Sequence, residues 1–229
     1  ALDAARRWML EPNGPEHCIV ATSEAALLPL FIHSYKRLGV LSPTTVEGYR
    51  QYPLDERRGG FRLCQLASAV VLRRMESLPA EDDARPWILD TAIGGEGYDL
   101  IRPDPQMATL RRLAGHLIAA RPVEVLHPHA PGTVEHDRLE LSALCDVHHA
   151  NHGSLPSRVY ANKGAIGHGL GAAGLTSLVI AAMCLRSGKV PPMPWLQQPM
   201  KRDGVAAEVA LDSDAGACSK DGVHAVFAM

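Results

Sequence analysis

The sequence predicts an α/β protein in which helices and sheets pack in layers. Short apolar runs that are rich in β-branched residues alternate with longer segments whose apolar residues recur at helical spacing. Glycine and proline separate the two kinds of segment, so most of them have a defined end. The 229 residues, 46% of them hydrophobic, suffice for one large core or two modest ones.

Apolar spacing and turn residues place the expected elements of the first part of the chain. These are a helix at 1–10, a buried strand at 17–22, a helical region from Ser23 or Glu24 to Leu38, and a strand at 61–73. Gly39 closes the helical region. A polar connection at 75–85 leads to the second part.

The second part again alternates strands with helices. We expect a strand at 87–93, an amphipathic helix at 105–120, a strand at 123–126, a helix at 137–148, a strand at 157–161, a long helix at 169–187, and strands at 205–211 and 223–227. Gly188 is typical of a left-handed cap for the long helix, and Pro191 and Pro192 bar its continuation.

Composition excludes several classes of protein. The formal net charge is -2 and the basic residues are scattered, so we expect no binding to nucleic acid or to an anionic membrane. The five cysteines form no CxxC pair and no signal peptide opens the chain, which favours a reducing, cytoplasmic setting. Glycines and Thr176 interrupt the most apolar run, 170–185, and it ends at Arg186, so a buried helix is expected rather than a membrane span.

The stretch from Arg158 to Gly174 joins a β-prone run to the long apolar helix through a Gly-His-Gly turn. The run stops at Lys163, and His168 lies in the turn. Open α/β proteins bind ligands at the carboxyl ends of strands, and a helix N-terminus adds partial positive charge. That charge disfavours an imidazolium, so His168 is expected to be neutral and to act as a hydrogen-bond donor or base. The alternative is a glycine-rich turn with an incidental histidine.

A second histidine follows the preceding strand. His129 comes after the strand at 123–126, and Lys163 and His168 come after the next one, so one sheet edge could hold all three. Two neutral imidazoles facing one cavity can donate N–H groups to an oxyanion or enolate, while Lys163 can hold a carboxylate or orient a histidine. Taken alone, His129 could equally bond local backbone.

These residues stand in motifs that resemble those of the β-ketoacyl synthases. His129-Ala-Pro-Gly132-Thr133, followed by Asp137 and Glu140, resembles the family's His-Gly-Thr-Gly-Thr…Asp…Glu motif. Lys163-Gly-Ala-Ile-Gly167-His168, followed by Ala-Ala-Gly at 172–174, resembles Lys-x-x-x-Gly-His…Ala-Ala-Gly.

Two earlier segments fit the same family. Pro-Leu-Asp-Glu-Arg-Arg-Gly-Gly-Phe at 53–61 is similar to Pro-Phe-Asp-x-x-Arg-x-Gly-Phe, and residues 22–42 resemble the Gly-Gly-x-Glu…Leu-Gly-x-Leu-Ser segment. The resemblance covers nearly the whole chain, in the right order.

The resemblance implies a thiolase-like fold of α/β/α/β/α layers, incomplete in this chain, with residues 1–85 ending the N-terminal half and 86–229 forming the C-terminal half. It also implies decarboxylative Claisen condensation of acyl and malonyl thioesters in fatty acid or polyketide synthesis. By that match, His129 and His168 bind the thioester carbonyl and stabilise the enolate, with support from Lys163. Thr133, Gly132, Gly167 and Phe61 are expected at the substrate.

The implied partners are an acyl carrier protein and another synthase subunit in a homo- or heterodimer. No cofactor is expected on this chain, since the phosphopantetheine arm belongs to the carrier, and no metal is expected either.

Departures from the family leave alternatives open. The family's nucleophilic cysteine precedes the helix that residues 1–10 resemble, and its Gly-Phe-Gly-Gly loop follows the strand that 223–229 resembles; neither is in this sequence. Cys18 and Cys64 are interpreted as core thiols, and Gln65 replaces a usual glutamate. A non-catalytic subunit resembling the chain-length factors is therefore an alternative.

A minor alternative is a zinc-binding protein. Seven histidine and cysteine residues cluster between 127 and 152: His127, His129, His136, Cys145, His148, His149 and His152. Their spacing matches no recognisable zinc motif.

Overall fold

The structure, a computed structural model, describes the chain except residues 44–50, 76–84, 100–101, 215, 218–222 and 224. The helices are α1 (Leu2–Leu10), α2 (Pro29–Arg37), α3 (Ala108–Ile118), α4 (Val134–His152), α5 (Lys163–Ile166) and α6 (Ala173–Ser187), with 3₁₀ turns η1 (Leu170–Ala172) and η2 (Gly204–Glu208). The strands are β1 (His17–Ala25), β2 (Gln65–Arg73), β3 (Val125–His127), β4 (Arg158–Val159), β5 (Lys189–Val190), β6 (Gly216–Ala217) and β7 (Val226–Ala228).

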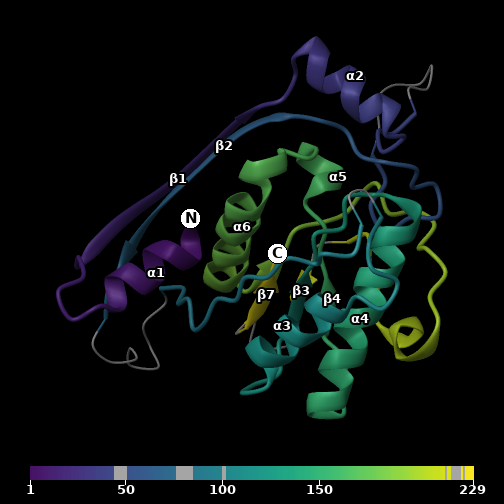
Figure 1. Cartoon of the computed structure of the whole chain (residues 1–229). Helices are drawn as coiled ribbons and strands as arrows, with labels where there is room; N and C mark the ends of the chain where they lie inside the picture. Colours follow the sequence, from purple (N-terminus) through teal and green to yellow (C-terminus); the bar gives the residue numbers. More distant parts are fainter. Residues whose placement is uncertain (44–50, 76–84, 100–101, 215, 218–222, 224) are drawn as a thin grey trace.

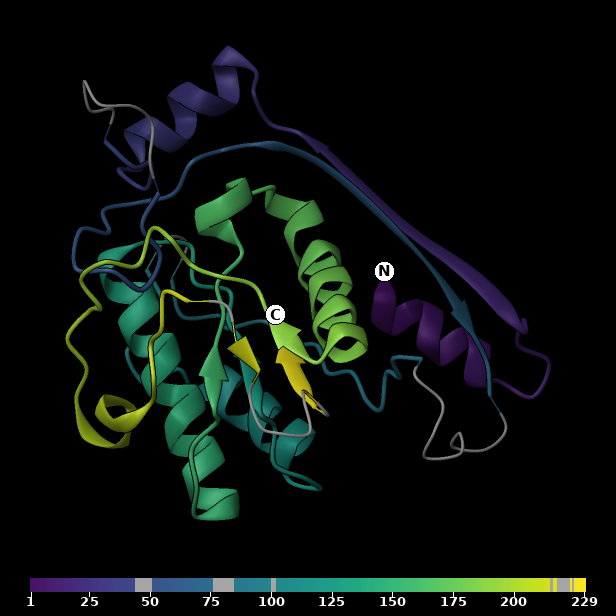
Figure 2. The same ribbon diagram turned by 180° about the vertical axis from the view of Figure 1, so that it is seen from behind.

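The described elements form successive layers (Figure 1). The parallel sheet β4-β3-β7 lies at the centre, with α6 on one side and α3 and α4 on the other. The antiparallel ribbon of β1 and β2 covers the far side of α6, as the reverse view also shows (Figure 2). The order ribbon, helix, sheet, helices is the layered α/β arrangement that the alternating pattern predicts.

The main core lies around the central sheet. Leu126 on β3 and Leu141 and Leu144 on α4 are almost fully buried in it. α4 ends at Gly153, whose φ of 65° is the left-handed conformation that terminates helices. Gly188, with a φ of 66°, ends α6 as the sequence predicts.

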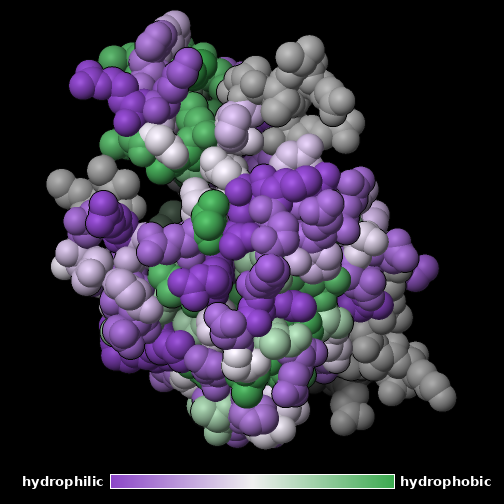
Figure 3. Space-filling model, turned by 90° about the vertical axis from the view of Figure 1, so that its right-hand side faces the viewer, coloured by the Kyte–Doolittle hydropathy of each residue, from purple (hydrophilic) through white to green (hydrophobic). Residues whose placement is uncertain are grey.

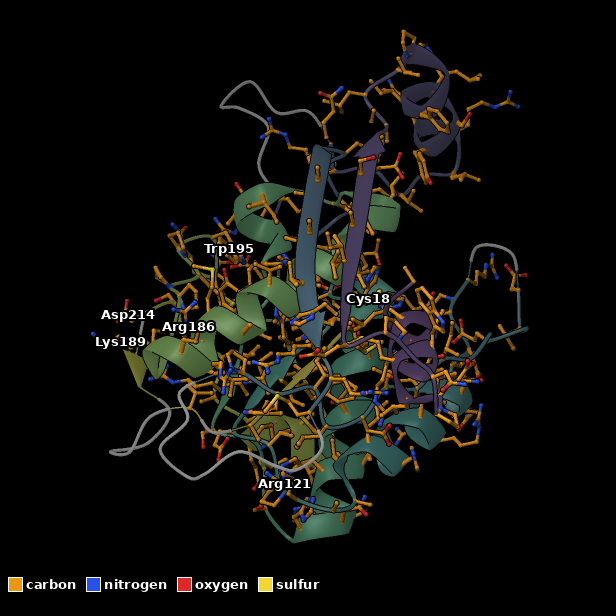
Figure 4. The ribbon with its side chains drawn as sticks, turned by 90° about the vertical axis from the view of Figure 1, so that its left-hand side faces the viewer. Cys18, Arg121, Arg186, Lys189, Trp195 and Asp214 are labelled. Atoms are coloured by element: carbon orange, nitrogen blue, oxygen red, sulfur yellow. The ribbon has the colours of Figure 1, made fainter. Side chains whose placement is uncertain are left out.

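The ribbon of β1 and β2 is apolar on both faces. On the inner face Val20 packs with Ala5 of α1 and Leu175 of α6. On the outer face Ile19 and Val71 oppose each other across the strands and are 72% and 68% exposed. Viewed from that side, the two strands pass in front of α6, and Cys18 lies on β1 (Figure 4).

Most of the predicted elements are confirmed. The helices at 1–10, 105–120, 137–148 and 169–187, and the strands at 17–22, 61–73, 123–126, 157–161 and 223–227, all have a counterpart within a few residues of the predicted ends. Of the predicted connection at 75–85, residues 76–84 lie outside the described part of the chain.

Two predicted strands are wrong. Residues 87–93 form no strand, and this segment instead bonds α1, with the Arg6 guanidinium donating to the Leu89 carbonyl and Thr91 to Asp3. The predicted strand at 205–211 is largely the 3₁₀ turn η2, which packs against α4. An apolar run becomes a strand only where a partner edge is available.

The predicted helical start at Ser23 or Glu24 is also wrong. Both residues continue β1, because Ala67 and Leu66 of β2 pair with them. The helix begins only at Pro29, whose fixed φ suits a first helical position. Exposed apolar side chains lie in α2 and just before it: Leu27, Leu28, Leu30 and Phe31. Figure 3 shows hydrophobic surface on the uppermost lobe of the molecule.

The segment Leu170–Ser187 is long and apolar enough to cross a membrane by length and composition alone. The core helix of a soluble protein passes the same test. In this structure it lies between the ribbon and the central sheet, as expected for the buried helix that the sequence predicts.

Close packing at α5 generates a stability prediction. A Cβ at Gly164 would lie 2.1 Å from the ring of Trp195, a buried residue, whereas a Cβ at Gly174 in α6 would meet nothing within 4 Å. We expect Gly164→Ala to lower the free energy of unfolding by about 1–3 kcal/mol. Gly174→Ala should be neutral or stabilising by up to about 1 kcal/mol, since alanine favours helix. Urea unfolding of both variants checks this, and equal stability would contradict the close packing at Trp195.

Candidate active site

Two neighbouring parallel strands bring the predicted site residues to one edge of the central sheet. His129 follows β3, and Lys163 begins α5 shortly after β4. A cavity of about 420 Å³ opens at this edge. Its walls come from several segments: Gly39, Val40, Gly59, Phe61, Arg102, Pro103, His129, Pro131, Thr133, Val134, Glu135, His136 and His168.

A larger cavity of about 560 Å³ lies elsewhere, between α1, the end of β2 and residues 85–89. It contains arginines but none of the predicted site residues. Two of these arginines are already paired, Arg6 with Asp90 and Arg73 with Glu16. The smaller cavity is therefore the better candidate for chemistry.

The imidazole rings of His129 and His168 lie together in the cavity wall. Their centroids are 4.9 Å apart with the rings steeply inclined to each other. Phe61 packs edge-on against His168 at 4.8 Å, so one face of that imidazole is held by an aromatic ring.

His168 is fixed by its neighbours in one tautomer. The Leu170 amide donates to Nδ1 of His168 at 3.2 Å, so the proton of the neutral ring sits on Nε2. Its backbone N–H donates to the Arg62 carbonyl at 2.7 Å. Gly167, with a φ of 87°, allows this approach, because a Cβ there would lie 3.0 Å from that same carbonyl.

Both histidines are neutral at pH 7. Burial lowers the pKa of His168 to about 3, helped by the positive charges of Lys163 and His136. Burial and Lys163 likewise hold the pKa of His129 well below 6.5. The prediction that His168 is neutral is confirmed, although the main cause is burial rather than a helix N-terminus.

Lys163 is almost fully buried and reaches back to the first histidine. Its Nζ donates to the backbone carbonyl of His129 at 2.5 Å. Burial lowers the pKa of Lys163 to about 8, although the carboxylates of Glu140 and Asp137 act in the opposite direction. Lys163 thus bonds the main chain that carries His129 and adds a positive charge behind both rings.

Two buried carboxylates one turn apart on α4 hold the loop that carries His129. Glu140 accepts the amides of His129 and Ala130 at 2.7 and 2.8 Å. Asp137 accepts the amides of Gly132 and Leu54, each at 2.9 Å. Burial raises the pKa of Asp137 to about 6 despite these bonds. For Glu140 burial also acts to raise the pKa, but His136 and the backbone amides outweigh it and lower it to about 2.

The four residues that the sequence predicts at the substrate differ in their position relative to the cavity. Thr133 and Phe61 line the cavity, whereas Gly132 and Gly167 are buried and only adjoin lining residues in the chain. Gly132 has a φ of 91°, and its carbonyl accepts the Gly60 amide at 2.8 Å. A Cβ at Gly132 would lie 2.9 Å from the Gly60 carbonyl, so this contact requires glycine.

The segment at 53–61 is fastened to residues 197–198 by its own buried carboxylate. Asp55 accepts from Arg57 and from the amides of Gln197 and Gln198. Burial acts to raise its pKa, but these bonds outweigh it and lower the pKa below 3.8. Asp55 therefore helps to place Gly60 and Phe61 beside the histidines.

Sequence reasoning overlooked His136 and Arg102 as cavity residues. In the sequence His136 stands out only as one of the possible zinc ligands, yet its ring centroid lies 5.4 Å from that of His129. Its spacing of i, i+4 from Glu140 was a signal that could have found it. Arg102 belongs to an irregular segment and left no pattern in the sequence.

Within the described residues, no group of three or more His, Cys, Asp or Glu side chains is arranged to hold a metal ion. Members of the proposed zinc cluster are otherwise engaged: His148 bonds the Val123 amide and the Ser154 carbonyl, and His152 bonds the Ile118 carbonyl.

The described cysteines include no activated thiol against the histidine pair. Burial raises the pKa of Cys64, whose amide bonds the His168 carbonyl, and burial raises that of Cys145 to about 12. A nucleophilic cysteine needs a lowered pKa. Cys145 is a buried core thiol, whereas Cys64, which the sequence predicts to be one, is only partly buried.

Comparison with known proteins relates part of this chain to a family. Residues 88–197 match the family model of the β-ketoacyl synthase C-terminal domain. The chain is 29% identical over 83% of its length to 3-oxoacyl-[acyl-carrier-protein] synthase 2 of Coxiella burnetii, of which it covers 47%. It is 31% identical over 66% of its length to highly reducing polyketide synthase 17 of Metarhizium anisopliae, of which it covers 5%.

Solved structures agree on the fold. A ketosynthase from module 6 of the bacillaene synthase of Bacillus subtilis superposes with a TM-score of 0.78 at 20% identity, over 93% of this chain and 39% of that one. A type II ketosynthase in complex with its acyl-carrier protein superposes with a TM-score of 0.74 at 18% identity, over 94% of this chain and 53% of that one.

The chain spans about half the length of the Coxiella synthase, and a smaller share of the fungal one. The matched region begins just after the described ribbon and includes His129, Lys163 and His168. Residues 88–197 of this chain, with its thiolase-like layered α/β fold, therefore correspond to the C-terminal domain of the β-ketoacyl synthases.

Proposed function

We propose that the chain serves decarboxylative Claisen condensation of malonyl and acyl thioesters, in fatty acid or polyketide synthesis. The observation that supports this most is the pair of neutral imidazoles, 4.9 Å apart, in the wall of one cavity. Two neutral imidazoles in the wall of one cavity are suited to donate N–H groups to a thioester oxygen that gains negative charge.

In the proposed reaction, His129 and His168 donate to the carbonyl oxygen of the malonyl thioester. The bond to the carboxylate breaks, CO₂ leaves, and its electron pair passes into the enolate. The enolate carbon then attacks an acyl thioester carbonyl and expels a thiolate. Lys163 holds the His129 main chain and, by its charge, opposes protonation of both rings.

We propose an acyl carrier protein as the substrate carrier, since a structural neighbour is a ketosynthase in complex with one. The phosphopantetheine arm would belong to that partner, and the chain itself would need no cofactor. A homo- or heterodimer with another synthase subunit, a cytoplasmic location and a boundary between two thiolase-like halves at 85/86 belong to the same proposal.

A second candidate function has the same fold but forms no covalent acyl-enzyme. In this proposal the chain is a non-catalytic subunit, resembling a chain-length factor, which shapes the acyl pocket of its partner. The raised thiol pKa of Cys64 and of Cys145 favours it. The native protein can be incubated alone with an acyl thioester, and mass spectrometry of an acyl-enzyme adduct separates the two candidates.

We expect His168→Ala, in the native protein that carries this sequence, to reduce CO₂ release from a malonyl thioester by about 10²- to 10³-fold, because one oxyanion donor is lost. His149→Ala, on the exposed end of α4, is the matched control and should retain the wild-type rate. Radiometric CO₂ release measures both. An unchanged rate in the folded His168 variant contradicts the oxyanion role.

Lys163 should control the acidic side of the pH profile. Its charge lowers the pKa of both His129 and His168, so Lys163→Met should raise both values. The variant's rings would then be protonated at higher pH, and its decarboxylation rate should fall earlier than that of the wild type as the pH is lowered.

The pH–rate profile of the Lys163 variant, with ¹⁵N NMR of the two imidazoles, tests this shift. Lys189→Met, an exposed lysine on β5 (Figure 4), is the control and should leave the profile in place. If the acidic limbs of the wild-type and Lys163→Met profiles are identical, the charge of Lys163 does not lower the pKa of the two histidines.

A further inference from the structure

His136 is a third histidine in the cavity wall, and its surroundings differ from those of the other two. It lines the cavity from the first turn of α4, and its ring centroid is 5.4 Å from that of His129. Its side chain is 29% exposed, so it is partly open to the cavity. The reaction proposed above does not use it.

The buried carboxylate of Glu140 faces this imidazole. Nδ1 of His136 lies 3.6 Å from Oε2 of Glu140, whose side chain is 1% exposed. Two backbone amides bond Glu140, yet they carry no net charge, so a buried carboxylate still benefits from a cation beside it. His136 stands where that cation is needed.

The groups that face His136 from each packed element agree with a positive charge. Burial lowers its pKa, but Glu140 and, more weakly, Asp137 of α4 and Glu96 of the preceding segment outweigh that effect and raise it above 6.5. His129 and His168, from the neighbouring loops, are neutral and offer no competing cation. His136 therefore carries charge under conditions where the other two histidines do not.

A cation beside two neutral donors suits a particular class of ligand. If the thioester carbonyl binds at His129 and His168, the ring of His136 lies about 5.4 Å from that of His129. A short acyl chain that ends in a carboxylate can span this distance. Arg102 lines the same cavity and adds a second positive charge. Glu135 is the acidic residue among those that line the cavity. An acyl group that ends in a carboxylate can pair with these cations, whereas a neutral acyl group cannot.

We propose that His136, as an imidazolium held by Glu140, is a specificity residue that binds the free carboxylate of a dicarboxylic acyl thioester whose carboxylate is retained, such as a succinyl group. The proposal rests on the proposed function for the thioester but assigns the carboxylate to a residue outside the oxyanion pair. His136 makes a contact to substrate in the ground state and donates nothing to the enolate oxygen.

The test uses equilibrium binding, which does not require turnover. Succinyl-pantetheine carries a carboxylate that is not β to the carbonyl and so is not lost as CO₂, and butyryl-pantetheine is its neutral counterpart of equal chain length. Calorimetry with the native protein should give tighter binding of the succinyl probe below the pKa of His136. Its affinity should fall as the pH rises from 5.5 to 8.5, while butyryl binding stays constant.

Substitution should remove the discrimination. We expect His136→Asn to weaken succinyl binding by about tenfold and butyryl binding by less than twofold, and His136→Lys, which restores a charge, to recover the preference. His149→Asn, on the same helix, should behave as the wild type. Equal weakening of both probes, or wild-type binding in His136→Asn, overturns the proposal, as does failure of the succinyl probe to bind wild type.

Two further measurements distinguish failure of this proposal from failure of the proposed function. Should the variants fail to fold, the wild-type pH titration with the two probes decides alone, since a role confined to structure predicts no difference between them. Absence of CO₂ release from malonyl thioesters would contradict the proposed function while leaving a measured carboxylate preference intact.

Discussion

The site depends on two buried carboxylates, Asp137 and Glu140, that project from one turn of α4 into the main chain of neighbouring loops. Between them they accept four backbone amides, from the loop that follows β3 and from Leu54. Burying two carboxylates is costly, and these amides, together with His136, offset the cost. Their geometry determines where His129 stands, and therefore whether a second imidazole can meet it.

The charges of the site are arranged in two groups. Lys163 lies behind the rings, fully buried, and holds the main chain of His129 while helping to keep both imidazoles neutral. His136 lies in the cavity wall against Glu140, with its pKa raised. In the proposed condensation, this cavity would offer uncharged donors to a developing oxyanion and a separate histidine to a charged substituent.

The sequence allowed the central sheet and its helices to be predicted, because each buried strand and amphipathic helix there carries its own pattern and its own stop signal. Prediction failed where a partner had to be known. Residues 87–93 are as apolar as a strand but bond to α1, and Ser23 and Glu24 extend β1 because β2 happens to run alongside them. Strand pairing depends on two segments, so the sequence of one segment alone does not show whether it will pair.

The sequence by itself determined the order of the motifs and the residue types of the site: His129 after one strand, Lys163 and His168 after the next, and Asp137 and Glu140 one turn apart. Only the tertiary structure decided what these groups do to one another. Burial rather than a helix N-terminus makes His168 neutral, Lys163 binds a carbonyl rather than an imidazole, and His136 lines the cavity beside Glu140, which raises its pKa. The reason is that protonation and contact depend on desolvation and on neighbours distant in the chain, and both arise only when the layers pack.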